Sequence, residues 1–234
     1  MTDENQEQNS SNRTPRAGVI RDMGVVDLRF AKSPEDLNEI QMIRDVGVVL
    51  IPECAAAALN RIQVSDVGSM VILPSNVPVN CMTGQLKLAG EALAAGDPDT
   101  ILVIVGQCFV TSTVPSVGYK EVRVVGQILV PRDSQAAFSS KLSQITGQIL
   151  YVPGGCRTVM GKETIDREFL EYLKEPVPLV IMGKVTFASD VPKDLLQAKI
   201  SEIVLMGKIT APKELISLLN VITSEKLGSI GTDD

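Results

Sequence analysis

The sequence contains no histidine and no tryptophan, and aromatic residues make up only 3% of its 234 residues. Without histidine, the chain has no Ser-His or Cys-His nucleophile system, no imidazole acid–base group and no imidazole metal ligand. The few aromatic side chains leave little on which bases or sugars stack. These absences favour a protein that is not an enzyme.

The sequence also lacks an excess of basic residues and a long apolar run. Its formal net charge is −6 and its pI is about 4.9, which predicts neither nucleic acid nor a membrane surface as a partner. No run approaches the roughly 18 apolar residues of a membrane span, and the polar N-terminus is unlike a signal peptide. The chain has no C-x-x-C pair, so we expect reduced thiols in the cytoplasm at the four cysteines, Cys54, Cys81, Cys108 and Cys156.

What the sequence does contain is an internal repeat marked by glycine. The pentad IRDMG at residues 20–24 returns as IRDVG at residues 43–47. Further glycines share this context, because each is followed two positions later by an apolar residue, mostly at intervals of about 20–24 residues. The repeat glycines are Gly24, Gly47, Gly68, Gly84, Gly106, Gly126, Gly147, Gly183, Gly207 and Gly228.

The residues around these glycines predict a strand followed by a short helix or turn. The position directly after the glycine is mostly polar and the next one is apolar, which is the alternation of a strand with one wet face. Proline-led segments that favour helix starts lie between the strands; they begin at Ser33, Ile51, Val130, Val191 and Ala211. The interval from Gly147 to Gly183 is long, and the segment KETIDREFLEYL within it predicts a helical insertion near 158–176.

A strand–helix unit of this length buries its apolar face by stacking on its neighbours. The sequence therefore predicts an α/β repeat solenoid of about ten coils, each a parallel β-strand plus a Pro-led short helix or turn. We expect a single domain over 18–231, a disordered polar tail at 1–17 and an acidic tail at 232–234. The alternative is a parallel β-helix, whose coils are usually shorter and lack helix-start signals.

The unit ISEIVLMGKITAPKELISLL at residues 200–219 resembles a leucine-rich repeat. The rhythm is clearest over 121–153 and 191–219, where apolar strand positions are followed by a Pro-led segment with spaced leucines. The chain departs from the family near Gly207, where the family has an asparagine. The resemblance implies a binding scaffold with a parallel sheet on its concave side, and it implies no shared catalytic residues.

Three aspartates share one position of the repeat, two residues before the glycine: Asp22, Asp45 and Asp66. Strands in register place them about 4.8 Å apart. Such a column either accepts backbone hydrogen bonds beside Arg21 and Arg44, binds a hard cation such as Ca²⁺, or supplies paired carboxylates for glycoside cleavage. We expect no other cofactor.

A polar column follows the glycines of the later coils, formed by Gln85, Gln107, Gln127, Gln148, Lys184 and Lys208. In register, glutamine side chains hydrogen-bond along a stack. The column is therefore either a self-satisfied amide ladder on a wet face or a recognition surface for an extended or acidic partner.

These features favour a non-enzymatic cytosolic interaction scaffold that presents a parallel-sheet face to a protein or an extended ligand. One alternative is a self-assembling structural protein similar to the bactofilin-type cytoskeletal polymers, in which solenoid ends stack. Another is a β-helix enzyme that acts on polysaccharide through the aspartate cluster.

Overall fold

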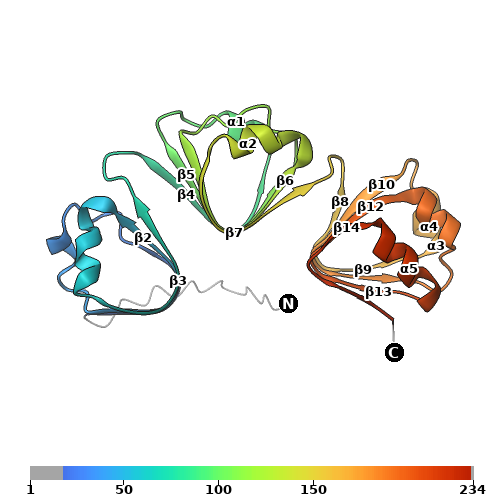
Figure 1. Ribbon diagram of the computed structural model, residues 1–234, viewed down its shortest axis with the longest axis horizontal. Coiled ribbons are helices and arrows are strands. Elements are labelled where there is room, and N and C mark those ends of the chain that lie inside the picture. Colours follow the sequence, from blue (N-terminus) through green and yellow to red (C-terminus); the bar gives the residue numbers. More distant parts are fainter. Residues whose placement is uncertain (1–17, 233–234) are drawn as a thin grey trace, which may run out of the picture.

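The structure is a computed structural model that describes residues 18–232, so the expected tail at 1–17 and the last two residues of the expected acidic tail lie outside the described residues. The described chain is a mixed α/β fold of parallel β-sheets and short helices. Figure 1 shows that the strands gather in three groups side by side along an arc, with the helices on its outer side.

Each group is a stack of rungs, and a rung is one pass of the chain through a strand that turns a corner. We call the residues before the corner the first arm and those after it the second arm. The strand continues through the corner in the first two groups, whereas the corner divides each rung of the third group into two strands.

The rungs are in sequence order within each group, and every strand pairing is parallel. The first group contains β1 (Val19–Asp27), β2 (Met42–Pro52) and β3 (Gln63–Leu73). The second group contains β4 (Val79–Leu88), β5 (Ile101–Val110), β6 (Glu121–Pro131) and β7 (Leu142–Val152). The third group contains β8 (Arg157–Val159) with β9 (Lys162–Ile165), β10 (Val177–Ile181) with β11 (Lys184–Phe187), β12 (Ile200–Leu205) with β13 (Lys208–Thr210), and β14 (Thr223–Lys226) with β15 (Ser229–Gly231).

Short helices close the rungs on the outer side of the arc. A helix follows each of the five Pro-led segments, as predicted, because proline fixes φ and lacks an N–H that a helix start leaves unpaired. The helices are η1 (Pro34–Leu37), η2 (Glu53–Asn60), α1 (Gly90–Ala94), η3 (Arg132–Ser134), α2 (Gln135–Ser139), α3 (Arg167–Tyr172), α4 (Lys193–Lys199) and α5 (Lys213–Ile222).

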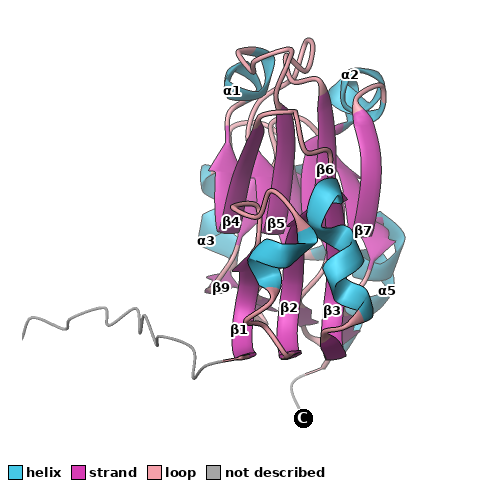
Figure 2. Cartoon of the chain, turned by 90° about the vertical axis from the view of Figure 1, so that its left-hand side faces the viewer, coloured by secondary structure: helices cyan, strands magenta, loops and turns pink. Residues whose placement is uncertain are grey.

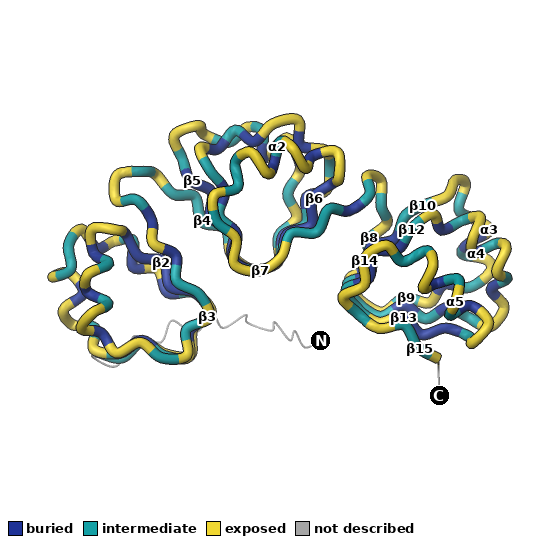
Figure 3. The backbone as a smooth tube through the Cα atoms, viewed as in Figure 1, coloured by how far each residue is buried: buried dark blue, intermediate teal, exposed yellow. Residues whose placement is uncertain are grey.

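Apolar side chains fill the inside of each group and also the two contacts between groups. Figure 3 marks the buried positions along the backbone in dark blue. At the first contact, Leu50 and Val71 from second arms of the first group pack with Val103 from a first arm of the second group. At the second contact, Leu129 of the second group packs with Val180 of the third. The same rule holds at both places, because the second arms of one group cover the first arms of the next.

The strands do not form one stack of about ten. They are divided among sheets of three, four, four and four strands, and the chain leaves one group and starts the next across the short interval from Gly68 to Gly84 and again after Gly147. The second arms of the first two groups have apolar residues on their outer face, such as Leu50 and Leu129, and this face is buried by packing arm against arm rather than by adding further rungs.

The helical insertion expected near 158–176 is instead a regular rung. β8 and β9 flank a corner at Gly161 and pair in register with the rung that follows, and only Arg167–Tyr172 is helical. The Asp166 side chain accepts a hydrogen bond from the Phe169 N–H at 2.8 Å and caps this helix. The segment Met160-Gly161-Lys162 matches Met182-Gly183-Lys184, so the sequence carried a signal for this rung.

Candidate functional site

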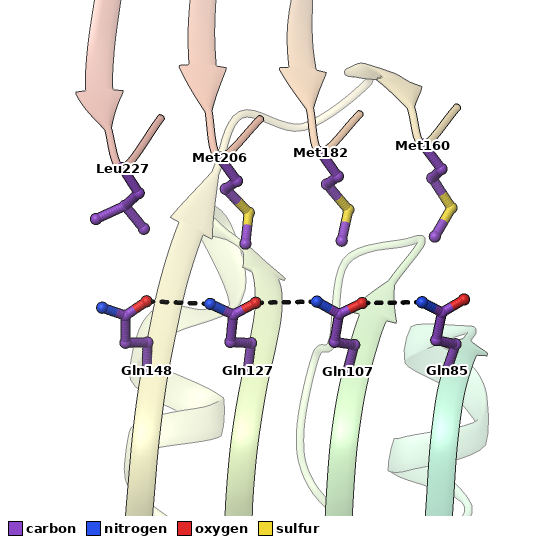
Figure 4. A pocket seen from close by; sticks show the side chains of 8 residues that line it. All are labelled: Gln85, Gln107, Gln127, Gln148, Met160, Met182, Met206 and Leu227. Carbon is purple, nitrogen blue, oxygen red and sulfur yellow. Dashed lines mark hydrogen bonds between the residues drawn. The ribbon is translucent and has the colours of Figure 1, made fainter. Parts of the chain in front are cut away.

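A groove lies between the corners of the second and third groups, on the concave side of the arc. It encloses about 410 Å³. Figure 4 shows its two walls facing each other. One wall consists of Gln85, Gln107, Gln127 and Gln148, and the other of Met160, Met182, Met206 and Leu227.

The glutamine wall is positioned by the corner glycines that precede it. Gly106 and Gly126 pair with each other in register, as do Gln107 and Gln127 directly after them. The corner needs glycine for two reasons. Its φ is +126° at Gly126, which lies in the region that side chains disfavour, and a Cβ on Gly126 would lie 2.1 Å from the carbonyl oxygen of Gly106.

The four glutamines form a continuous amide ladder. Each Nε2 donates to the Oε1 of the next rung, at 3.2 Å from Gln85 to Gln107, 3.1 Å from Gln107 to Gln127 and 3.3 Å from Gln127 to Gln148. The ladder has a direction, because the described residues offer no partner to the Oε1 of Gln85 or to the Nε2 of Gln148. The four glutamines thus form an amide ladder, which is one of the two alternatives that the sequence left open for this column, and the ladder also lines the groove.

The opposite wall was missed in the sequence. Each of its residues directly precedes a corner glycine of the third group, as Met182 precedes Gly183. The Met182 N–H donates to the Val159 carbonyl at 2.8 Å, and the Met206 N–H donates to the Ile181 carbonyl at 2.8 Å, so the backbone of neighbouring rungs fixes the column. The outermost side chains, Met160 and Leu227, are 42% and 48% exposed. The signal was the threefold Met-Gly-Lys.

Lys184 and Lys208 do not continue the glutamine column. They lie in β11 and β13, which are second arms of the third group. There they pair in register with each other and with Lys162. The prediction of one mixed column is therefore corrected to two columns in different groups. The cause is the change of group after Gly147, across which the repeat continues but the sheet does not.

Asp22, Asp45 and Asp66 occupy the corners of the first group. Their φ angles are 58°, 53° and 52°, in the left-handed region that Asp tolerates better than most residues. The flanking residues pair in register, so the three aspartates form the expected column. This conformation explains why the residue is Asp here, whereas the corresponding rungs of the second group turn at glycine.

Two of the three carboxylates of the aspartate column lie beside arginine side chains. The carboxylates of Asp22 and Asp45 lie 3.6 Å from the guanidinium groups of their neighbours Arg21 and Arg44. Among residues 18–232, no three His, Cys, Asp or Glu side chains form a group that could hold a metal ion. The column thus stands as a structural corner, and its predicted Ca²⁺ binding stays a prediction.

A charged contact joins the second and third groups. Arg132, after β6, makes a two-pronged ion pair with Glu202 of β12, in which Nη1 donates to Oε2 at 2.9 Å. The hydrogen bonds from Arg132 hold the pKa of the Glu202 carboxyl below its usual range, against a smaller opposing effect of burial. The pair links the two groups that supply the walls of the groove.

In the part of the chain that the structure describes, no helix is long and apolar enough to cross a membrane. A comparison with known protein families, with curated proteins and with solved structures finds no match to this chain, the leucine-rich repeats included.

Proposed function

We propose that this protein is a non-enzymatic interaction scaffold, that its three groups are short repeat solenoids, and that the groove binds an extended polypeptide segment of a partner protein. The observation that carries the proposal is that the glutamine wall faces the methionine wall, which ends in Leu227, and that each rung contributes one side chain to its wall.

The chemistry of the two walls fits a polypeptide. A glutamine inside the ladder, such as Gln107, uses one N–H and one oxygen lone pair along the stack and keeps a second of each for a ligand backbone. The methionine wall is flexible and polarizable, which suits apolar side chains of varied shape. A segment with one polar edge and one apolar edge therefore fits between the walls.

The lysine column favours acidic residues beside that segment. Lys162, Lys184 and Lys208 each follow a wall methionine by two residues, beyond the corner. All ion pairs among the described residues are made by arginine, so these lysines are not neutralised by one. The absence of histidine from the sequence supports a role without catalysis, and four free cysteines support a reducing compartment such as the cytoplasm.

The groove is tested by selecting peptides from a random display library on the immobilised protein and measuring their affinity for two matched variants. Met160→Lys changes a groove residue that is 42% exposed, and Met23→Lys makes the same change at a residue of the first group that is 45% exposed. We expect Met160→Lys to weaken the selected peptides about tenfold or more, which corresponds to about 1.4 kcal/mol.

The same peptides should bind the Met23→Lys protein as tightly as the unaltered protein, since Met23 lies outside the groove. Equal binding by all three proteins, or a selection that enriches no peptide, would contradict the groove as a binding site. Gln127→Ala tests the glutamine wall separately, because it removes a central member of that wall and leaves the methionine wall in place.

A further inference from the structure

The stacks end in two open faces. β4 and the rung formed by β8 and β9 lie at one face, and β7 and the rung formed by β14 and β15 lie at the other, as the facing of Gln85 with Met160 and of Gln148 with Leu227 in Figure 4 shows. Figure 2 shows that the first two groups advance in the same direction, from β1 to β3 and from β4 to β7. Among residues 18–232, no strand lies beside the outer backbone edge of any of these end strands, and such edges are templates for pairing with another chain.

The corner glycine in the first rung of the third group, Gly161, is not explained by the single chain. In later rungs a Cβ would collide with the carbonyl oxygen of the preceding rung, at 1.9 Å for Gly147 and at 1.8 Å for Gly228. A Cβ on Gly161, in the first rung of the third group, would meet nothing within 4 Å, and the φ of Gly161 is not in the left-handed region. Glycine is required there only if another rung precedes it.

The glutamine ladder has complementary ends at the two faces. Gln85, at the first rung, has an Oε1 to which no described residue donates, and Gln148, at the last rung, has an Nε2 that donates to no described residue. Figure 4 shows these two atoms at opposite ends of the row. A Gln148 placed before the Gln85 of another copy continues the ladder without a change of direction.

At each end face of the third group, a charged side chain occupies a column whose inner members are apolar. Glu163 heads a column whose next members, Val185 and Ile209, are fully buried. Lys226 ends a second column behind the buried Leu205. The first face also carries Arg157, whose Nη2 donates to Glu163 at 2.8 Å. Glu163 is thus paired within its own face, whereas Lys226 donates to Asn220 at 2.9 Å and makes no ion pair among the described residues. A stacked copy would place the rung that carries Glu163 against the rung that carries Lys226, which suits a contact between opposite charges.

From these observations we infer that copies of this chain stack head to tail through the second and third groups. β7 of one copy pairs with β4 of the next, and the β14–β15 rung pairs with the β8–β9 rung. The first group is one rung shorter and leaves a gap at each junction. This interface goes beyond the proposed groove function, although stacking joins the grooves of successive copies into one channel.

The inference is tested by sedimentation velocity of the full chain over a wide range of concentration. We expect the unaltered protein to shift to larger species as concentration rises. We expect Gly161→Ala to abolish the shift, because the new methyl group meets the carbonyl of the preceding copy, while its melting temperature at low concentration is unchanged. Gly154→Ala is the matched control, since its Cβ meets only an Asp133 oxygen at 4.0 Å.

A charge variant tests the same junction from the other face. Lys226→Glu replaces the cation at this face by a carboxylate, opposite the rung that carries Glu163 in the next copy, and should weaken association. Lys120→Glu makes the same change at an exposed residue away from both end faces and should not weaken it. An unaltered protein that stays monomeric at every concentration overturns the inference. So does a Gly161→Ala protein that associates like the unaltered one. Neither result bears on peptide binding in the groove.

Discussion

Glycine at the corners is the residue on which the rungs depend. In the second group the corner combines a positive φ with close contact to the preceding rung, since a Cβ on Gly126 would lie 2.1 Å from the Gly106 carbonyl. At Gly84 the φ is +102° but nothing lies within 4 Å of the Cβ position. Gly84 is therefore required only by its backbone conformation, whereas Gly126 is required by its backbone conformation and also by the close stacking of rungs.

We predict that Gly126→Ala destabilises the protein far more than Gly84→Ala. Alanine at Gly84 meets backbone strain alone, about 1–2 kcal/mol. At Gly126 the alanine methyl group also clashes with the backbone of the preceding rung. The loss in free energy of unfolding should therefore exceed about 4 kcal/mol, a range reached by few substitutions. Urea unfolding followed by far-UV circular dichroism at low protein concentration measures both. Equal losses of unfolding free energy in the two variants would contradict the prediction, because they would mean that the clash between neighbouring rungs costs nothing.

The cysteines show a second effect at this scale, because burial sets their reactivity. Burial raises the pKa of the Cys108 thiol to about 12, whereas Cys54 is exposed. We predict that a maleimide labels Cys54 first and reaches Cys108 only after unfolding, since the thiolate is the reactive form. Mass spectrometry of partly labelled protein, digested after quenching, checks the order. Early labelling of Cys108 would contradict its burial.

At the scale of the elements, the short helices contribute to stability through the side chains that they bury in the core of each group. The helix α2 has only the residues Gln135–Ser139, too few to be stable alone. Its Phe138 is fully buried in the core of the second group. The helix is thus held by packing and not by its own hydrogen bonds.

Phe138→Ala should therefore destabilise the protein by about 3–5 kcal/mol through lost burial and the cavity left behind. Phe30→Ala is the matched control, because Phe30 is 64% exposed and its loss should change stability by less than about 0.5 kcal/mol. Thermal unfolding of both variants measures the difference. A small effect at Phe138 would mean that α2 is dispensable to the second group.

At the scale of the whole molecule, the groups are joined by arm-to-arm apolar contacts and by arginines that cross between them. Arg29 forms an ion pair with Asp27 and donates to the Val79 carbonyl of the second group at 3.0 Å, and Arg132 binds Glu202 of the third. The hydrogen bond from Arg29 lowers the pKa of Asp27, as that from Arg132 lowers the pKa of Glu202. The contact of Arg132 depends directly on an ionised carboxylate, whereas Arg29 binds a carbonyl of the second group and depends on ionised Asp27 for its own position.

Acid should consequently loosen the junctions. Because the pKa of Glu202 is lower in the folded than in the unfolded chain, its contribution to stability is complete above the unfolded value of about 4.3 and is lost as the pH falls through the folded pKa. We expect Glu202→Gln to remove this part of the pH dependence and to cost less than about 1 kcal/mol at neutral pH, since the pair is partly exposed. Unfolding measured across the acid range, with Glu175→Gln as an exposed control, tests this; an unchanged pH profile for Glu202→Gln would contradict it.

The sequence by itself determined the rung. The alternation around the glycines, the Pro-led helix starts and the columns of glutamine and aspartate all follow from neighbours within one repeat, where strand period and helix capping act locally. Only the tertiary structure decided which rungs share a sheet, that Gly161 begins a new group, and that the glutamine column faces methionines and not lysines. Those outcomes depend on the burial of one group's second arms against the next group's first arms, a contact between residues far apart in the chain that the local pattern does not encode.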